Sequence, residues 1–406
     1  MGSIRDASLN SQASQLGALS FFKKASAIRR CSFIRGTRET VVTAGEHKMY
    51  LVGAGLAALD PLQQESYSPT LTNELSREHL FTAIIPFSPS AQFTVVVPTV
   101  AVLFADDGSV DITCPDDCES EASALLLEIL KADSAVCPDE PLSLEVGGTE
   151  SPPEFQSRVA SAIEKIASSD LKKVVLSKAM RLKSPKSPNS ARIFDRLVHD
   201  RPYTYLFSMN NYIGASPELV VSRDSSVITS YPLAGTASSG DEARLLLSEK
   251  DDREHSIVVK QIMARLTELG IATDLPPKPT ITSYGEIVHL GSRISGKVDR
   301  AKPFASIEVA AHISPTAAIN GEPYDSALKY IASFEPSDRG FYGGLVGYQK
   351  CGGDGAWVLN IRSIELVDDG LLLRAGVGIV DKSDPVQEDL EATSKINAIA
   401  SSLLEC

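Results

Sequence analysis

The sequence predicts an α+β protein that folds as a single large domain built on antiparallel β-sheets. Two observations predict this fold class. Runs of short strand patterns are interrupted by only a few long helix patterns, and neither an internal repeat nor a linker divides the 406 residues. These features favour an α+β domain over a doubly wound parallel sheet. The composition is that of a globular chain, because 43% of the residues are hydrophobic and 22% are charged.

Strands dominate the first third of the chain. Apolar patterning predicts five short strands, over residues 40–43, 49–52, 81–85, 93–97 and 100–104.

The stretch before these strands, residues 1–38, is rich in basic residues and serine and contains one acidic residue, Asp6. We expect an N-terminal extension here, with a frayed start followed by a basic helix. The main domain would then cover 39–406. An organelle transit peptide is the alternative interpretation of the first 38 residues.

Loops, helices and strands alternate through the middle of the chain. A stretch rich in proline, glutamate, glycine and serine predicts a surface loop over 133–153, and an amphipathic helix over 154–167 follows it. The elements expected next are a strand (171–182), a loop (184–190), a helix (193–198) and a meander of four strands (203–209, 212–214, 219–222 and 227–231).

The last part of the chain combines the longest helix pattern with further strands. Apolar residues spaced for one buried face predict a helix over 243–269. A final helix over 385–404 has acidic residues in its first turns, where they suit the helix dipole. Further strands are expected over 287–290, 341–349, 357–366 and 371–380.

The formal charge of -13, from 52 acidic and 39 basic residues, argues against nucleic-acid binding, because phosphate neutralisation requires clustered lysine and arginine. A small anionic substrate stays compatible, since a local basic pocket or a metal can reverse the field where it binds. The most apolar stretch, residues 93–105, is short and contains Pro98, so it predicts a buried strand and no membrane span.

Six scattered cysteines are typical of a reducing compartment, and we expect a cytoplasmic protein with free thiols. Cys114 and Cys118 are the only close pair. They do not predict a metal site, because no second cysteine or histidine pair with ligand spacing accompanies them.

Two acidic clusters have the helical spacing that a magnesium site could use. Asp251 and Glu254 lie three residues apart on one face of the longest predicted helix. Glu388 and Glu391 repeat that spacing in the final helix. If the two helices face each other, four carboxylates meet, and hard oxygen ligands are what Mg²⁺ prefers. Two solvated helix faces are the alternative interpretation.

Eight motifs occur in order over residues 155–398. They are KVVLS (173–177), GASPEL (214–219), PLAGT (232–236), SEKDDREH (248–255), FEPSDRG (334–340), YGGLVGY (342–348), DGAWVLNIR (354–362) and AGVGI (375–379). In this order they resemble the chorismate-utilising enzymes, and most closely the siderophore-pathway isochorismate synthases of bacteria. The resemblance implies antiparallel sheets packed as a sandwich with helices outside, chorismate as the substrate and Mg²⁺ as the cofactor. It also implies a monomer that works without a glutamine amidotransferase subunit.

The resemblance further implies roles for individual residues. Lys173 corresponds to the general base that activates water, and Glu218 to the general acid that protonates the departing ring hydroxyl. The corresponding metal ligands are Glu254 and Glu391 directly, with Asp251 and Glu388 in support. The corresponding substrate-binding residues are Thr236, His289, Ala318, Tyr342, Arg362, Gly376, Gly378 and Lys395.

Within this family the motifs favour water over ammonia as the nucleophile. Ala234 stands where aminodeoxychorismate enzymes have a lysine that attacks the ring, and anthranilate synthases lack the base that Lys173 represents. Ala318 stands where salicylate synthases commonly have threonine, which favours release of isochorismate. The alternatives are a salicylate synthase, which goes on to eliminate pyruvate, and a non-catalytic family member that acts as a binding protein.

Overall fold

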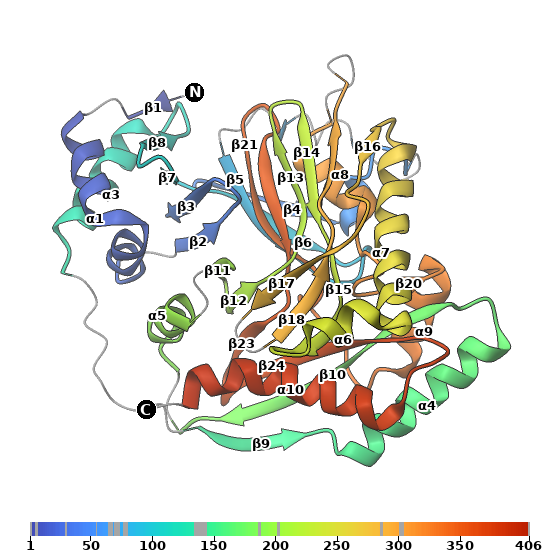
Figure 1. Cartoon of the computed structure of the whole chain (residues 1–406). Coiled ribbons are helices and arrows are strands. Elements are labelled where there is room, and N and C mark those ends of the chain that lie inside the picture. The colour runs from blue at the N-terminus through green and yellow to red at the C-terminus, as the bar shows by residue number, and fades with distance from the viewer. Residues whose placement is uncertain are drawn as a thin grey trace.

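The computed structural model of the protein describes the whole chain except residues 1, 5–6, 29–30, 54, 64–67, 69–73, 76–79, 134–143, 186–187, 201–203, 285–286, 300–303 and 405–406. Two large β-sheets and a small third sheet form the body of the molecule, and helices cover the outside (Figure 1). The strands pair antiparallel, which confirms the predicted α+β class.

The larger sheet has twelve strands. In spatial order they are β1 (Gly2–Ser3), β8 (Val110–Cys114), β7 (Val100–Ala105), β3 (Glu39–Ala44), β2 (Cys31–Arg35), β11 (Tyr205–Met209), β12 (Tyr212–Ser216), β23 (Ser363–Val367), β24 (Gly370–Ile379), β10 (Lys173–Lys183) and β20 (Gly321–Glu322), with β9 (Glu145–Thr149) also paired to β10. The long pair β10 and β24 runs in register from Val174 opposite Ile379 to Lys183 opposite Gly370.

The second sheet has nine strands, and its inner face packs against the larger sheet. In spatial order they are β16 (Thr273–Asp274), β19 (Ile294–Lys297), β14 (Val227–Tyr231), β13 (Leu219–Asp224), β22 (Gly355–Leu359), β21 (Leu345–Lys350), β5 (Leu80–Ile85), β6 (Phe93–Val97) and β4 (Lys48–Val52). Phe81 and Trp357 from this sheet share one apolar core with Val174 and Val377 from the larger sheet. The third sheet contains β15 (Leu233–Ser238), β18 (Ile287–Gly291) and β17 (Thr280–Tyr284).

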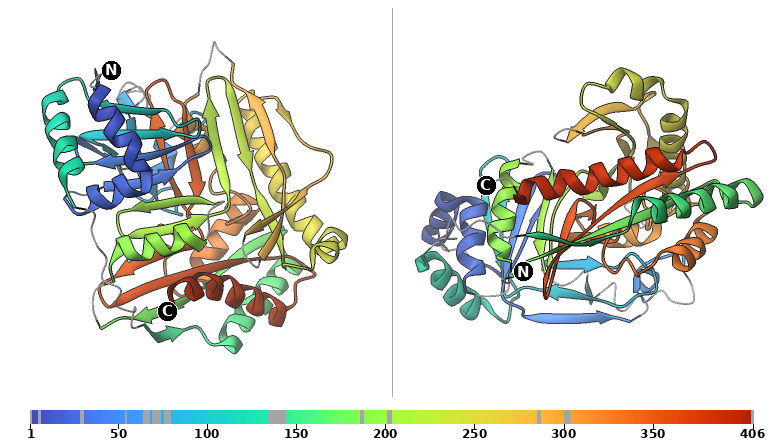
Figure 2. Two further views of the ribbon diagram at one scale, coloured as in Figure 1. Left: turned by 60° about the vertical axis from the view of Figure 1, so that its left-hand side comes forward. Right: turned by 90° about the horizontal axis from the view of Figure 1, so that it is seen from below.

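Helices flank these sheets (Figures 1 and 2). The helix α10 (Pro385–Leu404) lies along β24 and contacts α4 (Pro152–Ser168), and α7 (Glu249–Glu268) packs on β15. The remaining helices are α1 (Ala7–Ser26), the 3-10 helix η1 (Gly55–Ala58), α3 (Glu119–Lys131), α5 (Ser190–Asp200), α6 (Glu242–Leu247), α8 (Ser306–Ile313) and α9 (Tyr324–Phe334). Of the helices in the described part of the chain, none is long and apolar enough to cross a membrane.

The stretch expected as an N-terminal extension contributes to the core beside the larger sheet. Its described residues form β1, α1 and β2, and β2 pairs with both β3 and β11. The ring of Phe22 in α1 lies 5.5 Å from that of Phe33 in β2 and 5.0 Å from that of Phe194 in α5. The expected boundary at residue 38 falls between β2 and β3, which pair with each other. The phenylalanines give the basic stretch an apolar face that packs in the core.

Two expected elements are each divided in the structure. The helix expected over 243–269 is two helices, because Ser248 has extended backbone angles (φ -78°, ψ 110°) and caps α7. The strand expected over 357–366 is β22 and β23, which belong to different sheets. Arg362 lies at this break with a φ of 52°.

Other expected elements differ at their ends. The strand expected over 341–349 begins at Leu345, after a turn. The surface loop expected over 133–153 contains β9, and its residues 134–143 lie outside the described part. Residues 186–187 of the expected loop and residue 203 of the expected meander also lie outside it. The final helix was predicted with the bounds that the structure has.

Candidate active site

The chain passes between the two large sheets at two neighbouring points, and each point carries a predicted site residue. Glu218 lies in the connection from β12 of the larger sheet to β13 of the nine-stranded sheet. Residues 360–362 connect β22 back to β23 of the larger sheet. Backbone hydrogen bonds join the connections, from Leu359 N to Glu218 O (3.1 Å) and from Ala215 N to Arg362 O (3.2 Å). Glu218 and Arg362 therefore lie close together where the sheets meet.

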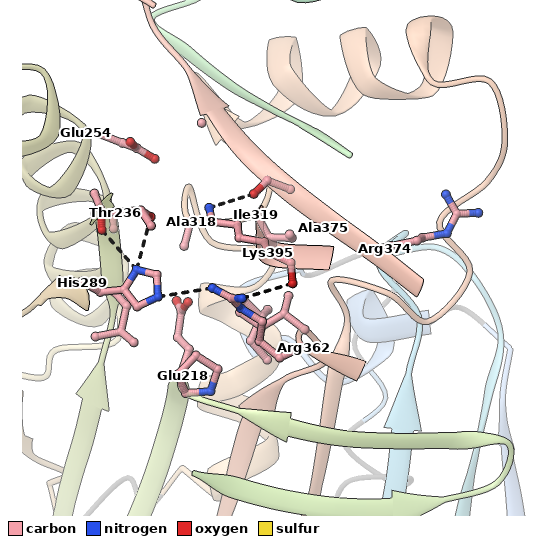
Figure 3. Close-up of a pocket in the computed structure, with 18 of the residues that line it drawn as sticks. Glu218, Thr236, Glu254, His289, Ala318, Ile319, Arg362, Arg374, Ala375 and Lys395 are labelled. Carbon is pink, nitrogen blue, oxygen red and sulfur yellow. Dashed lines mark hydrogen bonds between the residues drawn. The ribbon is translucent and has the colours of Figure 1, made fainter. Parts of the chain in front are cut away.

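A cavity opens at this junction, and Figure 3 shows the side chains that line it. The predicted site residues on its wall are Glu218, Thr236, Glu254, His289, Ala318, Tyr342, Arg362, Gly376, Gly378 and Lys395. A second cavity shares Thr236 and Lys395 with the first, and the other predicted metal ligands line it, namely Asp251, Glu388 and Glu391. Lys173 is fully buried behind Glu254. The structure therefore places every predicted site residue except Lys173 on the wall of one of two adjoining cavities, and Lys173 contacts Glu254 of that wall.

Glu218 is a buried carboxyl group whose ionisation is disfavoured. Its residue is 3% exposed, and burial raises the pKa to about 8, although Lys173, the backbone of Leu233 and Lys395 all act to lower it. Desolvation favours the neutral form of a carboxyl group. Glu218 is therefore mostly protonated at neutral pH and can donate a proton into the cavity.

Lys173 and Glu254 form a buried pair beside the cavity. Lys173 Nζ lies 3.2 Å from Glu254 Oε1, and the lysine side chain is 0% exposed. Within the described part of the chain, this amine makes no hydrogen bond of good geometry. Glycine at 378 is required here, because a Cβ would lie 2.1 Å from Glu254 Oε1 and 2.9 Å from Lys173 Cε.

His289 is neutral and fixed in one tautomer by its neighbours. Arginine can only donate, so Arg362 Nη2, which lies 3.4 Å from His289 Nε2, requires that nitrogen to be the acceptor. His289 Nδ1 then carries the proton and donates to Gly235 O at 3.2 Å. Burial, together with the charges of Arg362 and Lys395, lowers the pKa of His289 to about 3. His289 therefore orients the guanidinium of Arg362, to which Figure 3 shows it hydrogen-bonded. Because it is neutral, it does not act as an acid.

Lys395 and Tyr342 add polar groups to the cavity wall. Lys395 Nζ lies 2.6 Å from Glu391 Oε1 and 3.1 Å from Gly376 O. Burial raises the pKa of Tyr342 to about 12, so its hydroxyl keeps a proton to donate. A Cβ at Gly376 would lie 3.2 Å from that hydroxyl, so glycine leaves the strand backbone open to a ligand.

Arg374 lines the same cavity but was not among the predicted site residues. It lies on β24 two residues before Gly376 and four before Gly378. Since alternate residues of a strand face the same side, the two predicted glycines could have identified it. The apolar lining, which includes Leu233, Ile319, Leu359 and Ile361, had no comparable sequence signal.

The glutamates of the predicted metal site are each paired with a lysine. The pairs are Lys173 with Glu254 (3.2 Å), Lys250 with Glu388 (2.9 Å) and Lys395 with Glu391 (2.6 Å). Among the described residues, no three of the four predicted ligands bring one oxygen each within 4.8 Å of the others. The predicted carboxylates therefore lie on neighbouring helix ends without closing a ligand shell, because each glutamate is drawn towards its own lysine.

The ionisation of these carboxyl groups reflects their burial and crowding. Burial raises the pKa of Asp251 and, together with the charge of Glu391, that of Glu388. Burial alone would raise the pKa of Glu391 as well, but Lys395 and Lys250 outweigh it and lower the pKa. Glu388 is 1% exposed, and hydrogen bonds from Lys250 and Ser383 act to lower its pKa. A buried carboxylate crowded by a second carboxylate fits a divalent cation.

Comparison with known proteins identifies the family. The profile described as "Chorismate binding enzyme" matches residues 87–404, which include all of the predicted site residues. The chain belongs to the chorismate binding enzymes. Among related chorismate binding enzymes, "Isochorismate synthase DhbC" of Bacillus subtilis (strain 168) is 33% identical over 267 residues. That alignment covers 61% of this chain and 67% of the relative.

Solved structures agree with this membership. The crystal structure of DhbC from Bacillus anthracis matches with a TM-score of 0.77 and 26% identity, covering 96% of this chain and 99% of that one. MenF, the menaquinone-specific isochorismate synthase from Escherichia coli, shares the fold with a TM-score of 0.77 at 22% identity, covering 99% of this chain and 92% of that one. This chorismate binding enzyme is thus of the isochorismate synthase type.

Proposed function

We propose that the protein converts chorismate to isochorismate, adding water at ring carbon 2 while the hydroxyl of ring carbon 4 departs. The observation that carries this proposal is a buried carboxyl group on the cavity wall, Glu218, whose pKa is raised to about 8. A buried amine, Lys173, contacts Glu254 of the same wall. Water is a poor nucleophile and hydroxide a poor leaving group. A base and an acid at the two ends of the allylic system therefore both lower the barrier.

Lys173 is the proposed base and Glu218 the proposed acid. In its neutral form Lys173 takes a proton from the attacking water, and Glu218 gives its proton to the hydroxyl, which leaves as water. The lysine gains one proton and the glutamate loses one, so exchange with solvent must restore both before the next turnover. The contact between Lys173 and Glu254 (3.2 Å) supports a fixed position for the amine.

The cationic and donor groups on the cavity wall suit a substrate with two carboxylates. Arg362 offers a planar fork that can bind a carboxylate through two hydrogen bonds, and Lys395 offers a point charge. The Tyr342 hydroxyl and the exposed backbone at Gly376 and Gly378 add neutral donors. Thr236 and Ala318 complete the polar and small lining on which the ring would rest.

Mg²⁺ fits the acidic residues beside this wall, and we include it in the proposal. Glu254 and Glu391 would bind it directly, and Asp251 and Glu388 would support them. When bound, it would supply positive charge to a ring carboxylate of the substrate. The burial of Glu388 beside Glu391, whose charge helps to raise the pKa of Glu388, supports a cation at this place.

Product analysis tests the proposed reaction. Purified protein is incubated with chorismate and Mg²⁺, and the products are separated by chromatography. Isochorismate is the expected product. Salicylate with pyruvate would instead indicate a salicylate synthase, and no product beyond uncatalysed decay would indicate a binding protein. The small side chain of Ala318 on the cavity wall supports the first outcome.

The metal site has its own test. Glu254→Gln removes one charge of the proposed ligand set and is expected to lower kcat/KM by at least about 10²-fold. Glu249 lies on the same helix, and its side chain is 91% exposed. Glu249→Gln is therefore the matched control and should keep the normal rate. Titration calorimetry with Mg²⁺ should show weaker binding in Glu254→Gln only. A normal rate in Glu254→Gln would mean that Glu254 is not a ligand of a metal that the reaction needs.

We further propose that the enzyme acts as a monomer on chorismate, without a glutamine amidotransferase subunit. Ala234 lies on the cavity wall and has no amine that could attack the ring. The base proposed at Lys173 serves water, whereas ammonia would not need it. Adding an ammonium salt, which supplies free ammonia, to the aqueous assay should therefore give isochorismate and no aminated product. Light scattering during size exclusion should give the mass of one chain, 43.4 kDa.

A further inference from the structure

His47, Asp117 and Cys118 bring three metal-binding atoms together away from the proposed active site. In the described part of the chain, they are the one group of three histidine, cysteine or acidic side chains whose ligand atoms all lie within 4.8 Å of one another. His47 Nε2 lies 3.1 Å from Asp117 Oδ1. Cys114 precedes Cys118 by four residues and the two side chains are hydrogen-bonded, so a second sulfur adjoins the group.

These residues come from two parts of the fold. His47 lies between β3 and β4, where the chain passes from the twelve-stranded sheet to the nine-stranded sheet. Asp117 and Cys118 lie between β8 and α3, and Cys118 is the N-terminal cap residue of α3. Both segments lie against Thr99, because a Cβ at Gly45 would lie 2.5 Å from Thr99 Oγ1 and Cys118 Sγ lies 3.6 Å from Thr99 O. An ion at this place would join the turn between the sheets to the start of a helix.

The candidate ligand atoms are only weakly engaged by other groups. Within the described residues, the buried Nε2 of His47 has no hydrogen bond of good geometry. Cys118 Sγ lies 3.6 Å from the carbonyl oxygens of both Thr99 and Pro115. The Asp117 side chain is 70% exposed, which leaves a path for an ion from solvent.

We propose that His47, Asp117 and Cys118 bind a Zn²⁺ ion that joins the turn between β3 and β4 to the start of α3, with the adjoining Cys114 as the candidate fourth ligand. Imidazole, thiolate and carboxylate are the ligand types of tetrahedral zinc sites, whereas Mg²⁺ prefers oxygen ligands. Binding releases the thiol protons to solvent, since the thiolate is the ligand. None of these residues lines the cavities of the proposed active site, so the ion is structural and takes no part in the reaction there.

Cobalt spectroscopy tests this site in the full-length protein. Co²⁺ is added in the presence of excess Mg²⁺, which competes for the oxygen ligands of the proposed active site. We expect one bound equivalent of Co²⁺ with a thiolate-to-cobalt charge-transfer band, and loss of the band on addition of Zn²⁺. The band should disappear in His47→Gln and Cys118→Ser. It should persist in Cys351→Ser, whose exposed thiol makes it the matched control.

Thermal melting separates loss of the ion from loss of the fold. Zn²⁺ should raise the melting temperature of the wild type and of Cys351→Ser, but not that of His47→Gln or Asp117→Asn. With EDTA the wild type and the three variants should have the same melting temperature. Asp117 is mostly exposed, so Asp117→Asn should fold and keeps the test valid if Cys118→Ser does not fold. The proposal is overturned if the wild type shows no thiolate band or if the band survives in both His47→Gln and Cys118→Ser.

Discussion

Among single residues, Glu218 sets the pH range of the proposed reaction. It must carry a proton in order to protonate the departing hydroxyl, and its pKa is raised to about 8 by burial. We therefore expect kcat/KM to be level near neutral pH and to fall about tenfold per pH unit above about pH 8. Initial rates with saturating Mg²⁺ across this range measure the dependence. A rate that stays level to about pH 10 would assign the acid to another group.

Replacing Glu218 by glutamine separates proton donation from stability. Glutamine keeps the shape but has no carboxyl proton, so kcat should fall on the order of 10²–10⁴-fold.

The folded-state pKa of Glu218, about 8, lies above the ordinary value of 4.5, so the wild type loses stability as pH rises between these values. Glutamine does not titrate. The free energy of unfolding of Glu218→Gln relative to wild type should therefore increase by up to roughly 5 kcal/mol between about pH 4 and about pH 9.

Urea unfolding of both proteins at the two pH values checks this sign. A variant that loses activity without gaining relative stability at high pH would show that the carboxyl group is already ionised in the folded protein. Such a result would contradict the raised pKa of Glu218 while leaving its place in the cavity unaffected.

At the scale of elements, Ser248 connects helix capping to the proposed metal site. Its side chain accepts a hydrogen bond from Asp251 N at 3.2 Å and so begins α7, the helix that carries Asp251 and Glu254. Ser248→Ala should lower the free energy of unfolding by about 1 kcal/mol. Because the first turn of α7 would fray, the activity loss should be larger at limiting Mg²⁺ than at saturating Mg²⁺.

Ser248→Asn is the matched control, since asparagine caps helices about as well as serine. It should keep both the stability and the Mg²⁺ dependence of the wild type. If Ser248→Ala lost the same fraction of activity at every Mg²⁺ concentration, the helix cap would have no effect on metal binding.

The sequence pattern predicted most strands and helices, because burial imposes a period of two or 3.6 residues. It did not predict the break at Arg362, where apolar residues continue on both sides while the backbone turns at a φ of 52°. That break moves the chain from one sheet to the other. The same limit applies at Glu218, because local periodicity carries no information about which sheet the next strand joins.

The candidate site shows the same division between local and long-range information. The resemblance assigned Lys173, Glu218 and Glu254 to one reaction. The sequence alone could not show that they lie close together, because only the fold brings them to one place. Helical spacing indicated the acidic pairs but not the lysines that hold the glutamates apart. Cys118 had no ligand partner in the sequence pattern because His47 is distant along the chain.

At the scale of the whole molecule, buried Arg339 joins segments that are far apart in the chain. Its guanidinium donates to the carboxylate of Glu335 at 2.6 and 2.9 Å, and to the carbonyl oxygens of Ile319 and Val175 at 2.7 Å each. Glu335 also accepts from Ser177 N at 2.7 Å. Arg339 thus fixes β10 against the segment that places Ala318 and Ile319 on the cavity wall.

Removing one partner of this pair should cost more than removing both. Arg339→Met leaves the Glu335 carboxylate buried without its guanidinium, and the free energy of unfolding should fall by roughly 3–5 kcal/mol. The double variant Arg339→Met, Glu335→Met removes that uncompensated charge, so it should be more stable than the single variant, as measured by urea unfolding. Both variants lose the hydrogen bond to Ile319 O, so both should show reduced kcat/KM even where they are folded. A double variant less stable than Arg339→Met would mean that Glu335 stabilises the fold through Ser177 independently of the arginine.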